Sequence, residues 1–409
     1  MRKLTEKIKI PNIRFEGYTD AWEQRKLGEH AIIKGRLGWK SLKQEEYTLE
    51  GPSMIAGKHI VNGKIDWTKV DHIPDWRYDE SPEIMLENED IIFSKDGSLG
   101  NPAVINNLTV KATINSTMML VRTDKSIDSN FFYQILTGEA FDRLIYLKVS
   151  GSSIPHLFQA DMNEFEFLAP SLQEQRKIST FLSSADSLIA LHQRKLEELK
   201  SFKSTMLSKM FPKHGQTVPE IRLAGFDGEW ERTKLGALGS VAMNKRIFKD
   251  ETSEDGEIPF YKIGTFGGVA DSFISRARFE EYKQKYPYPE IGDILISASG
   301  SIGRTVEYMG EEAYYQDSNI VWLKHDNRLV NSFLKQFYSI VKWNGIEGTT
   351  IKRLYNKNIL ETEIPLPSPE EQQAIGELFS NLDDLISSTQ SKIGELKTLK
   401  KKLLQEMFV

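Results

Sequence analysis

Two stretches of the chain carry apolar residues at alternating spacings of three and four, the period of a helix with one buried stripe. One covers residues 173–211 and the other closes the chain, at residues 367–409. A Pro-Ser pair, Pro170-Ser171 or Pro367-Ser368, marks the start of each stretch and is followed by acidic residues, and lysines gather towards the C-terminal end, as the helix dipole favours. The pattern predicts two long helices, the first of 39 residues and roughly 58 Å.

The apolar stripe of each helix has the a/d spacing of a coiled coil and predicts a seam where helices pair. Both stripes skip a polar residue at one level, His192 and Thr389, which lie 197 positions apart. A polar residue in a seam commonly sets the register at some cost in stability. A second interpretation stays open, in which each stripe packs only against its own domain. The predicted seam residues are Ile178, Leu182, Ile189, Leu196, Leu199, Ile375, Phe379, Ile386, Ile393 and Leu396.

An internal repeat covers nearly the whole chain. Residues 10–28 read IPNIRFEGYTDAWEQRKLG, and residues 218–236 read VPEIRLAGFDGEWERTKLG. Two further segments return in the same order, NEDIIFSKDGSLG as IGDILISASGSIG and SGSSIPHL as EGTTIKRL. The offset between equivalent residues of the two copies shrinks from 208 to 203 and then 197, which indicates that the second copy has lost a few loop residues.

The repeat predicts two globular domains, each followed by a long helix. Short β-rich runs such as EDIIFS and GDILISA alternate with Gly/Ser turns, and residues 129–147 and 331–345 have a helical pattern. We expect an α/β (α+β) fold with mixed or antiparallel sheets. The predicted order is an N-terminal segment (1–20), a first domain (21–170), a first long helix (171–213), a second domain (214–366) and a second long helix (367–409).

Composition narrows the function classes. The formal net charge is −5, and neither globular segment is basic, which argues against DNA binding by bulk electrostatics and leaves only local basic patches. There is no cysteine, so disulfides and thiolate zinc sites are excluded, and the seven histidines are scattered. No apolar run approaches the ~20 residues of a membrane span and no secretory signal is recognised, so we expect a cytoplasmic protein.

No motif of a catalytic site survives inspection. The chain has no GxxxxGK[ST] phosphate loop, no GxGxxG between a strand and a helix, and no ordered cluster of metal ligands. The Asn/Asp-Pro-Pro-aromatic motif of adenine methyltransferases is also missing, and Asn101-Pro102-Ala103 does not match it. We therefore predict a protein without catalysis, cofactor or metal of its own.

Two GxxG turns, Gly97–Gly100 and Gly300–Gly303, are candidates for contact with a nucleic-acid backbone, because glycine lets a backbone approach closely. Each one alone is more often a tight turn between strands, and the recurrence in both copies brings a functional interpretation to about equal weight. The candidate contacts at these turns are Lys95, Gly97, Ser98, Gly100, Ser299, Gly300, Ser301, Gly303 and Arg304.

Local basic clusters supply further candidates, for which a solvated loop remains the alternative. Segments 34–80 and 242–288, which carry the main clusters, scarcely align between the copies. A repeated scaffold with two different faces predicts two different half-targets. The candidates are Lys34, Arg36, Trp39, Lys40 and Lys43 in the first copy, Lys245, Arg246, Lys249, Arg276 and Arg278 in the second, and Ser153, His156, Lys352 and Arg353 before the long helices.

Taken together, W-E-x-x-K/R-L-G at the start of each copy, D-I-[IL]-[IF]-S…G-S-[IL]-G in its middle and P-S-x-x-E-Q before a long helix resemble the DNA-specificity subunits of type I restriction-modification systems. The resemblance covers essentially the whole chain. It implies two target-recognition domains related by a pseudo-two-fold axis, each reading one half of an interrupted DNA sequence. It also implies that the two helices pair antiparallel and set the spacer.

The same resemblance implies partners. Two modification (methyltransferase) subunits would dock on the helices, and restriction subunits would join a larger complex. S-adenosylmethionine, ATP and magnesium would belong to those partners, which would also share the phosphate contacts. Two other classes stay open from the residues alone: a coiled-coil adaptor with protein- or glycan-binding domains, and a stand-alone DNA-modifying enzyme.

Overall fold

The computed structural model describes residues 10–37, 42–149, 155–344 and 352–409. The chain divides into two compact units. Unit 1 contains residues 1–194 together with the C-terminal residues 390–409, and unit 2 contains residues 195–389. The units therefore differ from the serial order of domains predicted above, because each takes one part of both long helices.

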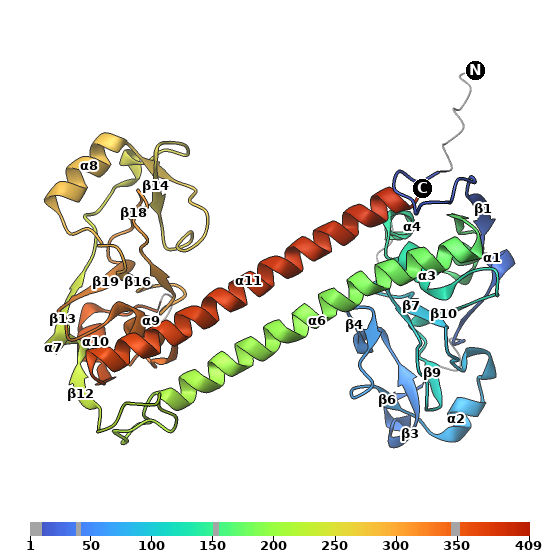
Figure 1. The fold of residues 1–409 in the computed structure, drawn as a ribbon, viewed down its shortest axis with the longest axis horizontal. Coiled ribbons are helices and arrows are strands. Elements are labelled where there is room, and N and C mark those ends of the chain that lie inside the picture. The colour runs from blue at the N-terminus through green and yellow to red at the C-terminus, as the bar shows by residue number, and fades with distance from the viewer. Residues whose placement is uncertain (1–9, 38–41, 150–154, 345–351) are drawn as a thin grey trace. The chain divides into compact units, whose positions relative to one another are not determined.

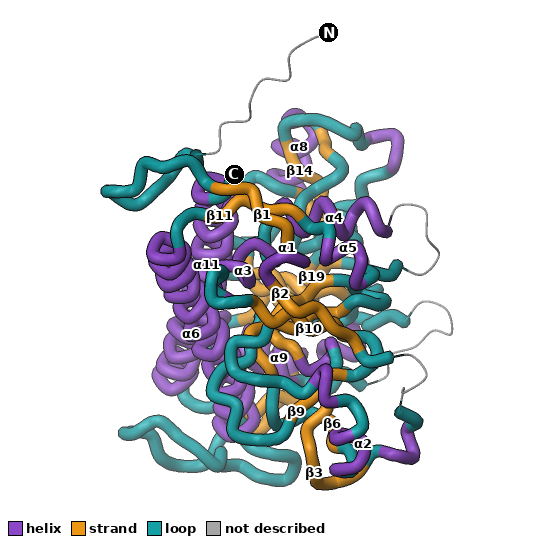
Figure 2. The backbone as a smooth tube through the Cα atoms, turned by 90° about the vertical axis from the view of Figure 1, so that its right-hand side faces the viewer, coloured by secondary structure: helices purple, strands orange, loops and turns teal. Residues whose placement is uncertain are grey.

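Unit 1 contains a four-stranded antiparallel sheet in the order β2-β10-β7-β8, a three-stranded sheet β6-β3-β9 and a two-stranded ladder β1-β11. Figure 2 shows β2 and β10 side by side. Its strands are β1 (Glu23–Lys26), β2 (Ala31–Gly35), β3 (Thr48–Ile55), β4 (Ile60–Val61), β5 (Lys64–Ile65), β6 (Asp71–His72), β7 (Ile91–Ser94), β8 (Gly100–Val104), β9 (Ala112–Ile114), β10 (Met118–Thr123) and β11 (Glu166–Ala169). Its helices before the first long one are α1 (Leu27–His30), α2 (Asp75–Asp79), α3 (Ser129–Leu136), α4 (Glu139–Val149) and α5 (Gln159–Asn163), with 3-10 turns η2 (Gln44–Glu46), η3 (Gly57–His59) and η4 (Pro82–Ile84).

Unit 2 repeats this topology with sheets β13-β19-β16-β17, β15-β14-β18 and β12-β20. In both units the three-stranded sheet contains one parallel pair, β3 with β9 and β14 with β18. Its strands are β12 (Glu231–Lys234), β13 (Gly239–Ala242), β14 (Ile258–Tyr261), β15 (Phe273–Ile274), β16 (Ile294–Ser297), β17 (Thr305–Glu307), β18 (Tyr314–Tyr315), β19 (Ile320–His325) and β20 (Glu363–Leu366). Its helices are α7 (Leu235–Leu238), α8 (Arg276–Lys285), α9 (Asn331–Ile340) and α10 (Asn356–Glu361), with a 3-10 turn η5 (Lys249–Glu251).

Every residue of β7, IIFS in sequence, is buried because both faces of this strand are covered. Ile91 and Phe93 point into the core that the sheet forms with α3 and the long helices. Ile92 points to the other side, into a second core that contains Ile55 and Ile114 of the three-stranded sheet. The four-stranded sheet is therefore the central layer of unit 1.

The first predicted helical stretch is divided in two, and the second is shorter than expected. Residues 129–147 form two helices, because α3 ends at Leu136 and Gly138 separates it from α4. In unit 2, α9 ends at Ile340, where Val341 has extended backbone angles. The predicted long helices are confirmed as α6 (Leu172–Met210) and α11 (Pro369–Met407), the two longest elements in Figure 1.

A serine starts each long helix. The Ser171 hydroxyl accepts from the backbone N–H of Glu174 at 3.4 Å, and the Ser368 hydroxyl accepts from that of Glu371 at 3.3 Å. An oxygen at this position satisfies one of the backbone donors that a helix start leaves open. The Pro-Ser signal read from the sequence therefore has this physical basis.

Within unit 1 the two long helices run antiparallel. Ile178 and Leu182 of α6 share a core with Met407 at the end of α11. Further along α6, Asp186 Oδ1 lies 2.6 Å from Nζ of Lys400, which precedes Met407 on α11. Towards the C-terminal end of α6, the contacts therefore move towards the N-terminal end of α11.

Unit 2 has the same arrangement with the helices exchanged. Ile375 and Phe379, near the start of α11, share a core with Met210 at the end of α6. Asp383 Oδ1 lies 2.5 Å from Lys203 Nζ. The seam positions Ile189, Leu196 and Ile393 are buried, and Leu199, Ile386 and Leu396 are partly buried, as a pairing seam requires.

The phenylalanine that directly follows each long helix completes an aromatic cluster. In unit 1, Phe408 stacks on Phe131 with ring centroids 5.3 Å apart, and both rings lie 5.9 Å from Trp22. Figure 1 shows the C-terminus beside β1. Unit 2 forms the same cluster from Phe211, Trp230 and Phe333. Among the described residues, no helix is long and apolar enough to cross a membrane.

Candidate nucleic-acid interface

The GxxG turn of unit 1 joins β7 to β8 and is bound to the segment that precedes α5. Gly97 and Gly100 have φ angles of +70° and +91°, which glycine adopts without strain. The backbone N–H of Leu157 donates to the Lys95 carbonyl at 2.9 Å, and Asp96 pairs with His156 through both backbone and side chain. The turn and the pre-helix segment therefore form one surface.

Unit 2 builds the same surface from equivalent residues. Gly300 and Gly303 have φ angles of +65° and +86°, and the N–H of Leu354 donates to the Ala298 carbonyl at 2.8 Å. An antiparallel bridge joins Ser299 to Arg353. The recurrence of this contact makes the joined turn and pre-helix segment a feature of the scaffold.

Residues 317–319 connect several of the candidate cations of unit 2. Asn319 Oδ1 accepts from the Ser299 hydroxyl at 2.7 Å and from Nη2 of Arg353 at 3.2 Å. Asp317 pairs with Arg246 at 2.9 Å, and Ser318 between them has the left-handed φ of +59°. Three separate sequence candidates thus converge on one short segment that the sequence did not single out.

A further loop flanks each GxxG turn. In unit 1, the Asn101 amide donates to the carbonyls of Gly57 and Ile60 at 3.3 and 3.2 Å, which fixes the loop after β3. In unit 2, Arg304 Nη2 donates to the Gly267 carbonyl at 3.3 Å and holds the loop after β14. Each candidate interface therefore consists of three segments: the GxxG turn, the pre-helix segment and the loop after the first strand of the smaller sheet.

The two interfaces differ in charge. In unit 1, Asp96 pairs with both Lys95, at 3.1 Å, and His156, so a carboxylate offsets the cations. In unit 2 the equivalent position is the neutral Ser299, and Arg304 is exposed with a backbone carbonyl as its hydrogen-bond acceptor. Unit 2 consequently presents the more donor-rich face.

The structure overturns Arg36 as a DNA contact. Its side chain is 3% exposed, and Nε donates to the Ile114 carbonyl at 3.2 Å. Burial lowers the pKa of this guanidinium from its ordinary value. Arg36 follows directly after β2 and its side chain is buried, so the prediction that this residue contacts DNA is wrong.

Ser299 is also removed from the direct contacts, because it is 6% exposed and its hydroxyl is used by Asn319. The second glycine of each turn serves packing: a Cβ on Gly100 would lie 3.1 Å from Ile145, and one on Gly303 would lie 3.0 Å from Trp343. The first glycines remain candidates for close approach, together with the exposed Ser98 and Ser301 of the two turns.

The other basic candidates are dispersed. Arg276 and Arg278 lie on α8 and are paired with carboxylates, and the hydrogen bond with Glu312 raises the pKa of Arg276. Lys245 lies 5.2 Å from the ring centre of Tyr286. Lys43, Lys249 and Lys352 are exposed, and Lys34 is half-buried in β2. Trp39, Lys40 and Ser153 lie outside the described residues.

Two exposed aromatic residues beside the interfaces were missed. Phe158 and Tyr355 occupy equivalent places just before α5 and α10 and are 59% and 49% exposed. The Phe158 ring lies 4.3 Å from that of His156. The two residues lie 197 positions apart, which is the offset of the repeat in this region, and this recurrence was the signal that could have identified them.

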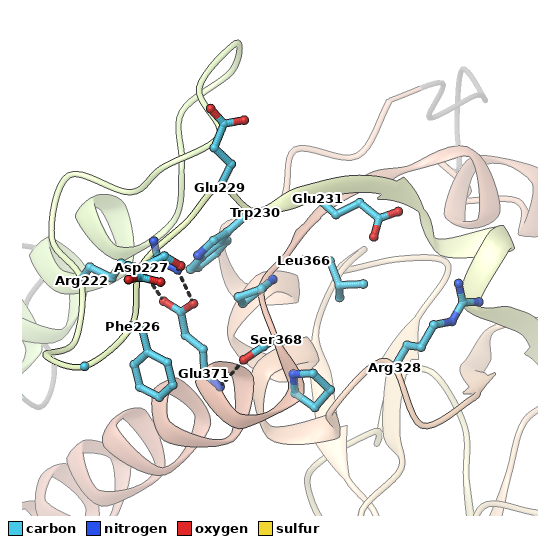
Figure 3. A pocket seen from close by; sticks show the side chains of 13 residues that line it. Arg222, Phe226, Asp227, Glu229, Trp230, Glu231, Arg328, Leu366, Ser368 and Glu371 are labelled. Atoms are coloured by element: carbon cyan, nitrogen blue, oxygen red, sulfur yellow. Dashed lines mark hydrogen bonds and ion pairs between the residues drawn. The ribbon is translucent and has the colours of Figure 1, made fainter.

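The repeated Arg and Glu-Gln positions have a structural role. Arg14 forms two hydrogen bonds with Glu174, at 2.7 and 2.8 Å, and Arg222 forms the same pair with Glu371. Figure 3 shows Arg222 and Glu371 joined beside the first turn of α11, at a hollow of about 520 Å³. These pairs fix the opening segment of each copy to the start of its long helix.

Each unit contains the same sheet topology and the same joined turn and pre-helix segment, with different side chains around them. The family model of the type I restriction modification DNA specificity domain matches residues 20–201 and again residues 227–398. The chain belongs to the family of type I restriction-modification DNA-specificity subunits, and this assignment displaces the adaptor alternative.

Two curated relatives match this chain over most of their own length. A putative type I restriction enzyme specificity subunit from Haemophilus influenzae is 36% identical over 308 residues, which are 74% of this chain and 77% of the relative. A type I restriction enzyme specificity subunit from Methanocaldococcus jannaschii is 24% identical over 79% of both chains.

Solved structures share the fold. The specificity subunit of a type I restriction-modification system from M. genitalium superposes with a TM-score of 0.63 at 17% identity, covering 98% of this chain and 99% of its own. A chain from a structure describing assembly and conformational transition of the type I R-M system reaches 0.54 at 18% identity, covering 94% and 97%.

Proposed function

We propose that the three-segment edge of each unit reads one half of an asymmetric, interrupted DNA site. The observation that carries this proposal is the convergence of Arg246, Arg353 and the GxxG turn on residues 317–319. A guanidinium held by a side-chain amide is oriented before DNA arrives, and arginine is the commonest specific reader of guanine in the major groove. The net charge of −5 is then compatible with binding, because the cations act locally.

The proposed subunit recognises DNA and leaves catalysis to partner subunits. In this proposal, S-adenosylmethionine, ATP and magnesium bind to those partner subunits. Two modification subunits dock on the long helices, one at each unit. A second apolar stripe supports docking: Phe181, Leu188 and Leu191 on α6 in unit 1 are 44%, 41% and 55% exposed, and Leu385 on α11 in unit 2 is 40% exposed. Exposed large apolar residues at heptad spacing are typical of a surface that a partner helix covers.

The test uses the chain reconstituted with its modification subunit. Arg304→Ala should weaken binding of a specific DNA duplex about tenfold or more, since an exposed guanidinium at the reading edge is lost. Arg328→Ala is the matched control, because Arg328 is an exposed arginine of the same unit that pairs with Asp326 away from the turn. Equal loss in both variants would contradict the proposed edge.

A further inference from the structure

The outer surfaces at the starts of α6 and α11 occupy equivalent places in the repeat but differ in charge. Residues 171–191 contain two acidic and two basic residues, whereas residues 368–388 contain five acidic residues and no lysine or arginine. One acid in each stretch, Glu174 or Glu371, is buried against an arginine. The contrast therefore lies mainly on the exposed face.

In unit 1 this face is an apolar groove with a basic rim. The groove has a volume of about 800 Å³ and is lined by Phe15, Leu172 and Phe181. Phe15 meets Phe181 edge to face with ring centroids 5.9 Å apart. Arg176 and Lys177 are exposed at its border.

In unit 2 the equivalent positions carry a smaller apolar side chain, and acidic side chains appear where unit 1 has none. Leu378 stands where unit 1 has Phe181, and it packs partly against the core of its own unit. Gln373 replaces Arg176, and Glu377 replaces Thr180. Asp384, where unit 1 has Ser187, is exposed as well.

We infer that the two docking faces bind two copies of one partner chain with unequal affinity, and that unit 1 is filled first. This inference rests on the proposed docking of two modification subunits. The partner surface that fits unit 1 has an apolar anchor flanked by carboxylates, complementary to the groove and to Arg176 and Lys177. An identical second copy brings the same carboxylates to Glu377 and Asp384, where like charges repel.

The consequence is assembly in two separated steps with opposite responses to salt. Added salt screens the attraction at unit 1 and weakens the first step. The same salt screens the repulsion at unit 2 and strengthens the second step. The gap between the two dissociation constants should therefore narrow as ionic strength rises.

The experiment titrates the full chain with the purified modification subunit and counts bound copies by native mass spectrometry, with dissociation constants from calorimetry at low and high salt. We expect the 1:1 complex to accumulate at low salt, with the second step at least about tenfold weaker. Phe181→Ala should weaken the first step about tenfold or more, because a large apolar anchor is lost. Leu378→Ala, its matched control in unit 2, should leave the first step unchanged.

Charge variants separate this inference from a general loss of fold. Glu377→Lys should strengthen the second step and reduce the accumulation of the 1:1 complex. Equal stepwise constants, apart from the statistical ratio of two independent sites, would overturn the inference while leaving the proposed docking intact. Absence of any binding by the folded chain would overturn the proposed docking and the inference with it.

Discussion

Asp186 of α6 and Lys400 of α11 form an ion pair of 2.6 Å, and the repeat places the same pair in unit 2 as Asp383 and Lys203. The side chains of Lys400 and Asp186 are 12% and 29% exposed, so the pair is partly shielded from water. Gln134 also donates to Asp186 at 3.1 Å. The pair thus connects both long helices to α3 of unit 1.

Breaking this ion pair should lower the free energy of unfolding. Exchanging the two charges, with Asp186→Lys and Lys400→Asp in one chain, should restore part of that free energy. Asp186→Ala and Lys400→Ala are each expected to lower the free energy of unfolding by about 1 kcal/mol, with a measurable coupling in the double variant. Urea unfolding of the four proteins measures this coupling. Lys392→Ala with Glu395→Ala, an exposed pair on α11, is the control with little coupling. A coupling no larger than that control would contradict the role of Asp186 and Lys400.

Two glycines of α11 should respond oppositely to alanine. A Cβ on Gly376 would overlap the Ser332 hydroxyl, whereas one on Gly394 would meet no described atom within 4 Å beyond its chain neighbours and the backbone of its own helix. Gly376→Ala should lower the free energy of unfolding by about 1–3 kcal/mol through overpacking. Gly394→Ala should raise it by about 0.5–1 kcal/mol, because alanine loses less backbone entropy in a helix. Thermal unfolding checks both, and two changes of the same sign would refute the packing at Gly376.

Buried His59 should make unit 1 sensitive to acid. Its Nδ1 accepts from the Ala56 N–H at 3.0 Å, which only an unprotonated nitrogen can do, and burial lowers the pKa of the ring. Asp71 and Asp66 oppose that shift, and Lys58 adds to it. The unfolded chain takes up a proton below pH about 6.5 while the folded chain resists it, so stability is lost as pH falls through that value. Urea midpoints at pH 5.5 and 7.5 should differ less in His59→Gln than in the original chain.

Asn319 should affect specificity through Arg353. Asn319→Ala removes the acceptor that holds the guanidinium and should reduce discrimination at one base position of one half-site by about 1–3 kcal/mol. Binding to unrelated DNA should change little, because sequence-independent binding depends on attraction between cations and phosphates, to which a neutral amide adds little. Competition binding with single-base variants of the site measures the discrimination. An equal loss for specific and unrelated DNA would show that Asn319 serves only the fold.

The long helices could be predicted because one period extends over nearly 40 residues and Pro-Ser marks each start. The smaller sheets could not be predicted, since segments 34–80 and 242–288 scarcely align although they form the same ladders. Strand pairing depends on backbone hydrogen bonds and on alternation between buried faces, which different side chains satisfy equally.

The arrangement of the candidate residues could be predicted in part, and their contact with DNA stays a prediction. The GxxG turns and the pre-helix segments were found because they recur, and the structure joins them. Arg36 was misjudged because the charge of a side chain does not show whether the backbone directs that side chain into the core. Asn319 gave no local signal, since its importance comes from contacts with Ser299 and Arg353, which are distant in sequence.

The most direct test of the central claim is single-molecule methylation sequencing of DNA from cells that carry this chain with its modification partner. Residues 30–150 are exchanged for the equivalent region of a related specificity subunit. We predict that one half of the methylated sequence changes, while the other half and the spacer stay the same. A change in both halves, or in neither, would contradict the assignment of one half-site to each unit.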